Sequence, residues 1–214
     1  GVMAPRAWLE KLVQWAHTHS IIIAADEGCY NDLYFQEKPV SILEVAKEGV
    51  ITFYSLSKRN NMTGYRVGFA AGDSEIIAAF QKVKTNIDSG TQNFVQEAAI
   101  AALNDSMHVE RMRKEYEQKK DMMLEALTKI GLPRCDSPAT FYIWQRASEG
   151  MTGEELAEKF LDVGIVVTPG AWISDTTDDG VNPGEQYVRF ALVPTMEEVE
   201  DAAERITSID LLQS

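Results

Sequence analysis

The sequence contains little cysteine and histidine, and it has no long apolar run. Its 214 residues include only two cysteines, Cys29 and Cys135, which lie far apart and predict neither a disulfide framework nor a metal cluster. The three histidines, His17, His19 and His108, lack the spacing of metal ligands and are expected at the surface. No apolar run reaches the roughly 20 residues that cross a bilayer. We therefore expect no structural disulfide, no metal site and no membrane span.

Basic residues are also scarce, because 20 Lys and Arg stand against 33 Asp and Glu, giving a formal charge of −13. This charge is repelled by nucleic acid and by anionic membranes, so neither is expected as a partner, and the cytoplasm is the expected location. The first residues, GVMAPRAWLEKL, have no basic segment followed by an apolar stretch and do not form a secretory signal. A helix is expected within a few residues of this start, which indicates the middle of a longer protein.

Short apolar runs alternate with helical patterns in the first half of the chain. The runs IIIAAD (21–26), VITFYSLS (50–57) and RVGFAAGD (66–73) have the length of strands that are buried on both faces. This alternation predicts an α/β layer with a mainly parallel sheet. Helices are expected over residues 41–48, 74–86 and 93–105.

The pattern changes after Asp105. Residues 107–131 form a long charged amphipathic pattern that stops at Gly131 and Pro133, which predicts one long helix. We therefore expect two domains, residues 1–105 and residues 106–214, with the long helix as the connector. In the second domain we expect strands over 141–145, 165–170 and 187–193, and helices over 152–164, capped by Thr152, and 195–206.

The stretch YSLSKRNNMTGYRVGF, residues 54–69, places two cations and two serines between two apolar runs. Burial at the end of a strand disfavours an ammonium and favours the neutral amine, which adds to aldehydes to form a Schiff base. Lys58 is the candidate for that role. Ser55 and Ser57 offer hydroxyl donors, and the guanidinium of Arg66 has the planar geometry that suits phosphate. The stretch predicts an anion pocket beside a nucleophilic amine.

Two further polar residues follow the first apolar run, namely Asp26 at its end and Tyr30 just beyond it. The ends of parallel strands meet in one crevice, where α/β folds bind ligands. A carboxylate, an amine, a phenol and a phosphate pocket together suit pyridoxal 5′-phosphate, because a carboxylate beside the pyridine nitrogen keeps the ring an electron sink.

These residues resemble the lysine signature of the class I/II aminotransferases, which are fold type I pyridoxal-phosphate enzymes. The step of three from Ser55 to Lys58 and the step of eight from Lys58 to Arg66 both match that signature. The resemblance covers essentially the whole chain and implies a partial large domain with a mainly parallel sheet, followed by a small C-terminal α+β domain. The other matching segments, in the family's order, are DEGCYNDLYF, GTQNFVQEAAIAAL, SPATFYIW and NPGEQYVRFALV.

The resemblance implies a role for each residue of the candidate site. Lys58 would carry the cofactor as a Schiff base and then move a proton, while Ser55 and Arg66, with help from Ser57, would bind its phosphate. The remaining roles are Asp26 paired with the ring nitrogen, Tyr30 as donor to the phenolic oxygen, and Arg189 as the partner of the substrate α-carboxylate.

The sequence departs from the family pattern in two places. Asp26 lies four residues before Tyr30, whereas the family spacing is three, which Glu27 has. A one-residue bulge at Gly28 would absorb the difference, so Asp26 is preferred and Glu27 stays the alternative. The family's N-terminal elements are also expected to be missing, including a glycine-containing phosphate loop and an aromatic residue stacked on the pyridine.

Within the family, the matching segments resemble members that transfer the amino group of N-succinyl-LL-2,6-diaminopimelate to 2-oxoglutarate in lysine biosynthesis. Aminotransferases acting on aspartate, alanine or LL-diaminopimelate are the close alternatives. A fold type I lyase or synthase, an effector domain of a regulator, and an inactive fragment are the rival hypotheses. The resemblance further implies a homodimer whose partners are amino-acid and 2-oxo-acid substrates.

Overall fold

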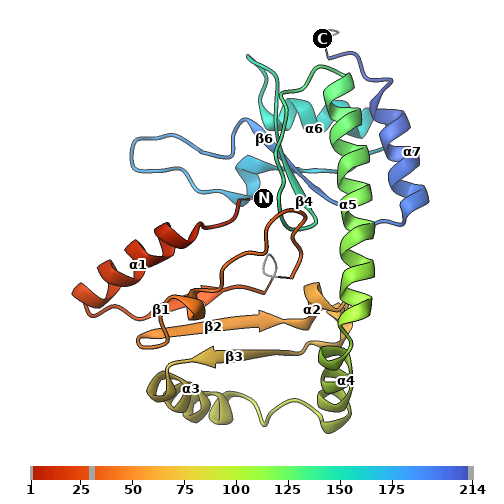
Figure 1. Ribbon diagram of the computed structural model, residues 1–214. Helices are drawn as coiled ribbons and strands as arrows, with labels where there is room; N and C mark the ends of the chain where they lie inside the picture. Colours follow the sequence, from red (N-terminus) through yellow and green to blue (C-terminus); the bar gives the residue numbers. More distant parts are fainter. Residues whose placement is uncertain (1, 29–31, 212–214) are drawn as a thin grey trace. The chain divides into compact units, whose positions relative to one another are not determined.

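The computed structural model describes residues 2–28 and 32–211 (Figure 1). The chain folds into two compact units, Val2–Arg113 and Lys114–Ser214, and the division falls within helix α5 (Ser106–Lys129). Among the described residues, no helix is both long and apolar enough to cross a membrane.

A three-stranded sheet forms the centre of the first unit. Its order is β1-β2-β3, with β1 (Ile23–Asp26) parallel to β2 (Val50–Ser55) and β3 (Gly68–Gly72) antiparallel to β2. The parallel arrangement that the sequence predicts thus holds for β1 and β2, whereas the sheet as a whole is mixed. The connection from β2 to β3 contains only the short turns α2 (Leu56–Arg59) and η2 (Thr63–Tyr65). A parallel β3 would need a longer crossover.

Helix α1 (Arg6–Thr18) covers one face of this sheet. Leu9 and Val13 of α1 pack with Val50 of β2 and with Ile42, and all four side chains are buried. Burying such a side chain contributes about 1.5–3 kcal/mol. Ile42 belongs to η1 (Ile42–Glu44), a single turn where the sequence predicts a helix over 41–48. The apolar contact of Ile42 therefore survives although the helix is shorter.

Two helices of the first unit keep much of their apolar surface exposed. Helix α3 (Ser74–Ile87) has no buried residue, although Phe80 meets Phe53 of β2 edge to face with ring centroids 5.7 Å apart. Asp73 caps α3, and hydrogen bonds from the amides of Gly49, Glu75 and Ile76 hold the pKa of its carboxyl below the usual range. Exposed apolar side chains on α3 and on α4 (Asn93–Asn104) include Val83, Ile87, Phe94 and Ile100.

The second unit contains an antiparallel sheet with the order β4-β6-β5. Ile143 and Val188 from the sheet are fully buried, as is Phe160 of α6, which meets Phe190 edge to face. Helix α6 begins with a capping box of Thr152 and Glu155, so the cap predicted at Thr152 is confirmed. The elements are β4 (Tyr142–Arg146), α6 (Gly153–Asp162), β5 (Thr168–Pro169), η3 (Gly170–Ile173), β6 (Tyr187–Ala191) and α7 (Met196–Ile206).

The approach of β3 to β2 gives a prediction about stability. A Cβ at Gly72, whose φ is +153°, would lie 2.1 Å from the carbonyl oxygen of Val50. Gly72→Ala should therefore lower the free energy of unfolding by about 2 kcal/mol. The matched control is Gly64→Ala, because a Cβ there meets nothing within 4 Å, and a change below about 1 kcal/mol is expected. Urea unfolding measures both, and equal losses would contradict the steric argument.

Candidate active site

The predicted nucleophile lies on a short helix that continues directly from β2. Ser55 caps α2, its Oγ accepting a hydrogen bond from the Ser57 amide at 3.2 Å. Leu56, which is fully buried, anchors the first turn, and Lys58 follows two residues later in a half-buried position. The position of Lys58 is thus fixed by a strand end, a cap and a buried leucine.

Arg66 reaches the same helix from the loop that follows it. Its Nη1 donates hydrogen bonds to the Ser57 Oγ at 3.3 Å and to the Thr63 carbonyl at 2.9 Å. The backbone of Arg66 is left-handed, with φ 53° and ψ 49°, a conformation that costs roughly 1–3 kcal/mol outside glycine and often marks a functional loop. The structure therefore brings Ser57 and Arg66 together.

Asp26 lies at the end of β1, where its backbone is paired with that of Phe53 in β2. The next turn passes close to Ser55, because a Cβ added to Gly28 would lie 3.0 Å from the Ser55 nitrogen and 3.3 Å from Oδ1 of Asp26. The Gly28 amide donates to that Oδ1 at 3.1 Å. Gly28 thus separates the Asp26 carboxylate from Ser55 by the width of one backbone, and any side chain there would crowd both.

Glu27, the alternative to Asp26, occupies a different environment. Its side chain is only 1% exposed, whereas Asp26 is exposed. The Glu27 carboxylate accepts hydrogen bonds from the Ser41 hydroxyl, the Ile42 amide and the Tyr54 hydroxyl. A ligand would have to displace these donors to reach Glu27, so the contrast favours Asp26 as the partner of a cofactor ring. Tyr30 and the residues on either side of it lie outside the described residues.

Arg189 lies in the middle of β6 in the second unit, between Trp144 of β4 and Thr168 of β5. Its guanidinium carbon lies 4.8 Å from the centre of the Tyr142 ring. The Nε atom is buried and has no hydrogen-bond partner within the described part of the chain. A buried donor without a partner costs about 1–3 kcal/mol, so this nitrogen favours an anionic ligand such as a carboxylate.

The donors around Arg66 fit the phosphate of a small cofactor. Arg66 lines a hollow of about 680 Å³ together with Tyr65, Thr91 and Phe94, but Ser55, Ser57, Lys58 and Asp26 are not among its lining residues. In the described contacts the oxygens of Ser55 and Ser57 accept hydrogen bonds, and a hydroxyl that accepts can also donate its proton. The guanidinium and these hydroxyls suit a phosphate ester, and the amine of Lys58 suits an aldehyde.

A second set of contacts, which the sequence does not predict, holds the end of helix α2, the helix that carries Lys58. The side-chain amide of Asn60, a buried residue, lies 3.1 Å from the Ala102 carbonyl and 2.8 Å from Nε2 of His108. Nδ1 of His108 lies 3.3 Å from Asp105. His108 is therefore half-buried in a polar network, and the expectation of a surface histidine is wrong at this position. The one sign of these contacts in the sequence is Asn60, a polar residue directly after the end of α2.

The fold and the donor set define an α/β protein with a lysine just beyond the end of β2 and an arginine in the loop that leads into the antiparallel strand β3. The chain matches the family model of aminotransferase class I and II over residues 1–206. It therefore belongs to that family, whose members use pyridoxal phosphate.

Several relatives and solved structures are similar to the chain. An LL-diaminopimelate aminotransferase of Aquifex aeolicus is 45% identical over 207 residues, which cover 94% of this chain and 51% of that enzyme. An aminotransferase from Neisseria meningitidis has 34% identity and a TM-score of 0.89 over 97% of this chain and 54% of its own. A probable N-succinyldiaminopimelate aminotransferase from Thermus thermophilus has 32% identity and a TM-score of 0.83, with 97% and 55% covered. The chain thus spans about half the length of the relatives it matches.

The contact between Arg66 and Ser57 leads to a prediction about the affinity for pyridoxal phosphate when Arg66 is replaced. Arg66→Ala should raise the dissociation constant for pyridoxal phosphate by about 10- to 100-fold, because charge-assisted hydrogen bonds are lost. Binding of pyridoxal, which has no phosphate, should change little. The matched control is Arg59→Ala, which removes a cation from the same segment and its ion pair with Asp32 at 3.4 Å. Absorbance titration measures the constants, and equal losses in both variants would contradict the assignment.

Proposed function

We propose that the chain acts in a pyridoxal-phosphate-dependent aminotransferase that exchanges the amino group of a diaminopimelate-type amino acid with 2-oxoglutarate. The observation that supports it most is the loop from Ser55 to Arg66, which holds a lysine beside a serine and arginine pair at the end of β2. The family match and the names of the relatives support the same proposal.

Each residue of the proposed site has one task. Pyridoxal phosphate, when bound, supplies the electron sink that stabilises negative charge at the substrate Cα. Ser55, Ser57 and Arg66 bind the phosphate, and the amine of Lys58 holds the aldehyde end. Asp26 is the partner of the ring nitrogen, and Tyr30 donates to the phenolic oxygen.

Lys58 then acts as an acid and a base. Its Nζ would take the proton from the substrate Cα and pass it to C4′ of the cofactor, a task that needs an amine held close to the substrate. The short helix α2 supplies this constraint, because the Ser55 cap and buried Leu56 fix the turn that carries Lys58.

Arg189 recognises the α-carboxylate, which every amino donor and every 2-oxo acceptor shares. Its unpartnered buried Nε supports this role, because Nε and one Nη together form the two parallel hydrogen bonds that a carboxylate accepts. The substitution Arg189→Lys keeps the charge and loses that geometry.

The amino donor has two candidates. The sequence segments favour N-succinyl-LL-2,6-diaminopimelate, and the name of the Thermus thermophilus structure agrees with it. LL-diaminopimelate is the second candidate, because that substrate is in the name of the relative with 45% identity. Arg189 serves both donors, so the distinction must come from residues that meet the distal end of the substrate.

The proposal also includes a cytoplasmic location and a homodimer. Gel filtration tests the homodimer, because it measures the size of the assembly.

Amino transfer to 2-oxoglutarate from each donor tests the proposal, with glutamate formation as the readout. Arg189→Ala should lower kcat/KM by about 100-fold, because a carboxylate loses a charge-assisted pair. The matched control is Arg146→Ala, which removes an exposed arginine from the neighbouring strand, where its guanidinium is hydrogen-bonded to the side chain of Gln186. Its kcat/KM should stay within about twofold. Glutamate formation that needs neither donor, or equal losses in the two variants, would contradict the proposal.

A further inference from the structure

A buried carboxylate lies directly beside the proposed cofactor-binding aspartate and takes no part in the functions described so far. The oxygens of Glu27 accept hydrogen bonds from Ser41 Oγ and from the Ile42 amide, both at 2.7 Å, and from the Tyr54 hydroxyl. Removing a carboxylate from water costs free energy that an apolar side chain would not cost. A fully hydrogen-bonded polar network of this kind fixes one geometry instead.

The geometry that is fixed is the end of β1. The amide of Glu27 donates to the Phe53 carbonyl at 3.1 Å, which extends the pairing with β2 by one residue beyond Asp26. Successive side chains of an extended strand point to opposite faces, so the face that holds the Glu27 carboxylate is opposite to the face that presents Asp26. The difference in exposure between these two neighbours agrees with this alternation.

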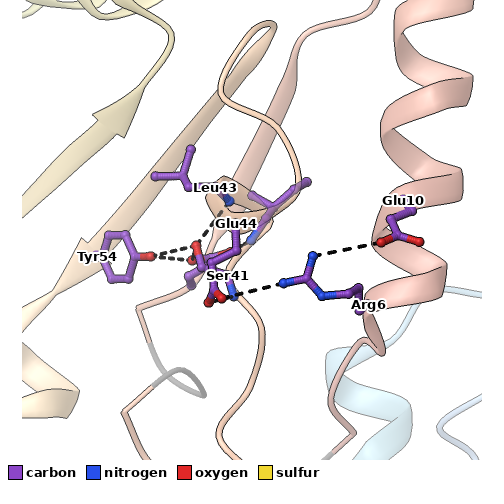
Figure 2. A network of polar contacts seen from close by, with 8 residues as sticks. Arg6, Glu10, Ser41, Leu43, Glu44 and Tyr54 are labelled. Carbon is purple, nitrogen blue, oxygen red and sulfur yellow. Dashed lines mark hydrogen bonds and ion pairs between the residues drawn. The ribbon is translucent and has the colours of Figure 1, made fainter.

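The donors of the network come from elements that are themselves held in place. Tyr54 lies on β2, and its ring stacks on Phe69 of β3 with centroids 4.8 Å apart. Ser41 caps η1, where its Oγ accepts from the Leu43 amide at 3.2 Å. Figure 2 shows the side chains of Ser41 and Tyr54 meeting. It also shows Arg6 reaching Glu44 from α1, with 3.7 Å between the charged atoms.

We propose that Glu27 is a positioning residue for Asp26, and that the hydrogen bonds of Tyr54, Ser41 and Ile42 to Glu27 set the direction of the Asp26 carboxylate. The inference rests on the proposed function, because only a bound pyridine ring gives that direction a chemical use. Glu27 itself does not touch the cofactor in this account.

Affinity for pyridoxal phosphate in single and double variants tests the inference. Glu27→Ala should weaken binding by about tenfold, by analogy with the outer-shell partners of metal ligands, and Asp26→Ala should weaken it more. Tyr54→Phe keeps the ring on Phe69 and removes only the hydroxyl, and a loss of about threefold is expected. Because Glu27 acts through Asp26, the double variant should bind within about twofold of Asp26→Ala alone.

The matched control is Thr52→Val. Thr52 is buried on the same strand as Tyr54, two residues earlier, and its hydroxyl donates to the Ala71 carbonyl at 3.1 Å. This variant also loses one buried hydrogen bond, so it shows what a loss of stability alone does to binding, and less than about a twofold change is expected. Losses that add up in the double variant, or equal losses in Tyr54→Phe and Thr52→Val, would overturn the inference.

A second readout is independent of the cofactor. If the unaltered chain binds no pyridoxal phosphate, the proposed function fails for this chain, and amide exchange at residue 27 decides the inference about Glu27. The amide that donates to Phe53 should exchange at least about tenfold faster in Glu27→Ala and in Tyr54→Phe than in Thr52→Val. Equal exchange in the three variants would overturn the positioning role.

Discussion

The parallel pairing of β1 with β2 is the interaction on which the candidate site depends. It sets Asp26 beside Phe53 and brings the turn at Gly28 against the backbone of Ser55. Asp26 and Ser55, which are far apart in the sequence, therefore lie at the same end of the sheet. Helix α2, which carries Lys58, starts from the same end of β2. A shift of the β1–β2 register by one residue would exchange the faces on which Asp26 and Glu27 lie.

The polar groups at this strand end differ in burial and in their hydrogen bonds. The buried carboxylate of Glu27 is held by hydrogen bonds from Ser41 and Ile42, whereas Asp26 is exposed. Arg66 has an unfavourable left-handed backbone, and its guanidinium donates a hydrogen bond to the Ser57 hydroxyl. Such local cost is typical of sites whose geometry matters more than their stability.

Part of this structure could be predicted from the sequence, because apolar runs that end in polar residues identify strands and their ends. The three strands of the first unit and the Thr152 cap follow from such patterns. The direction of β3 did not, since it depends on how the loop after Lys58 folds. The helix predicted over residues 41–48 is only the single turn η1. Ser41 and Ile42 in this region also bond to Glu27, which lies 14 and 15 residues away, and no local pattern contains such contacts. The domain division at residue 105 stays a prediction, and so do the roles of all the site residues, namely Asp26, Tyr30, Ser55, Ser57, Lys58, Arg66 and Arg189.

The most direct test of the account is a covalent one at Lys58. Pyridoxal phosphate is added to the purified chain, the visible spectrum is recorded, and the adduct is trapped with borohydride and located by peptide mapping, with Lys58→Ala as the control. The account predicts a yellow adduct that is trapped at Lys58 and absent from the variant. An adduct spread over other lysines, or equal trapping in the variant, would contradict the claim that the loop from Ser55 to Arg66 forms the cofactor site.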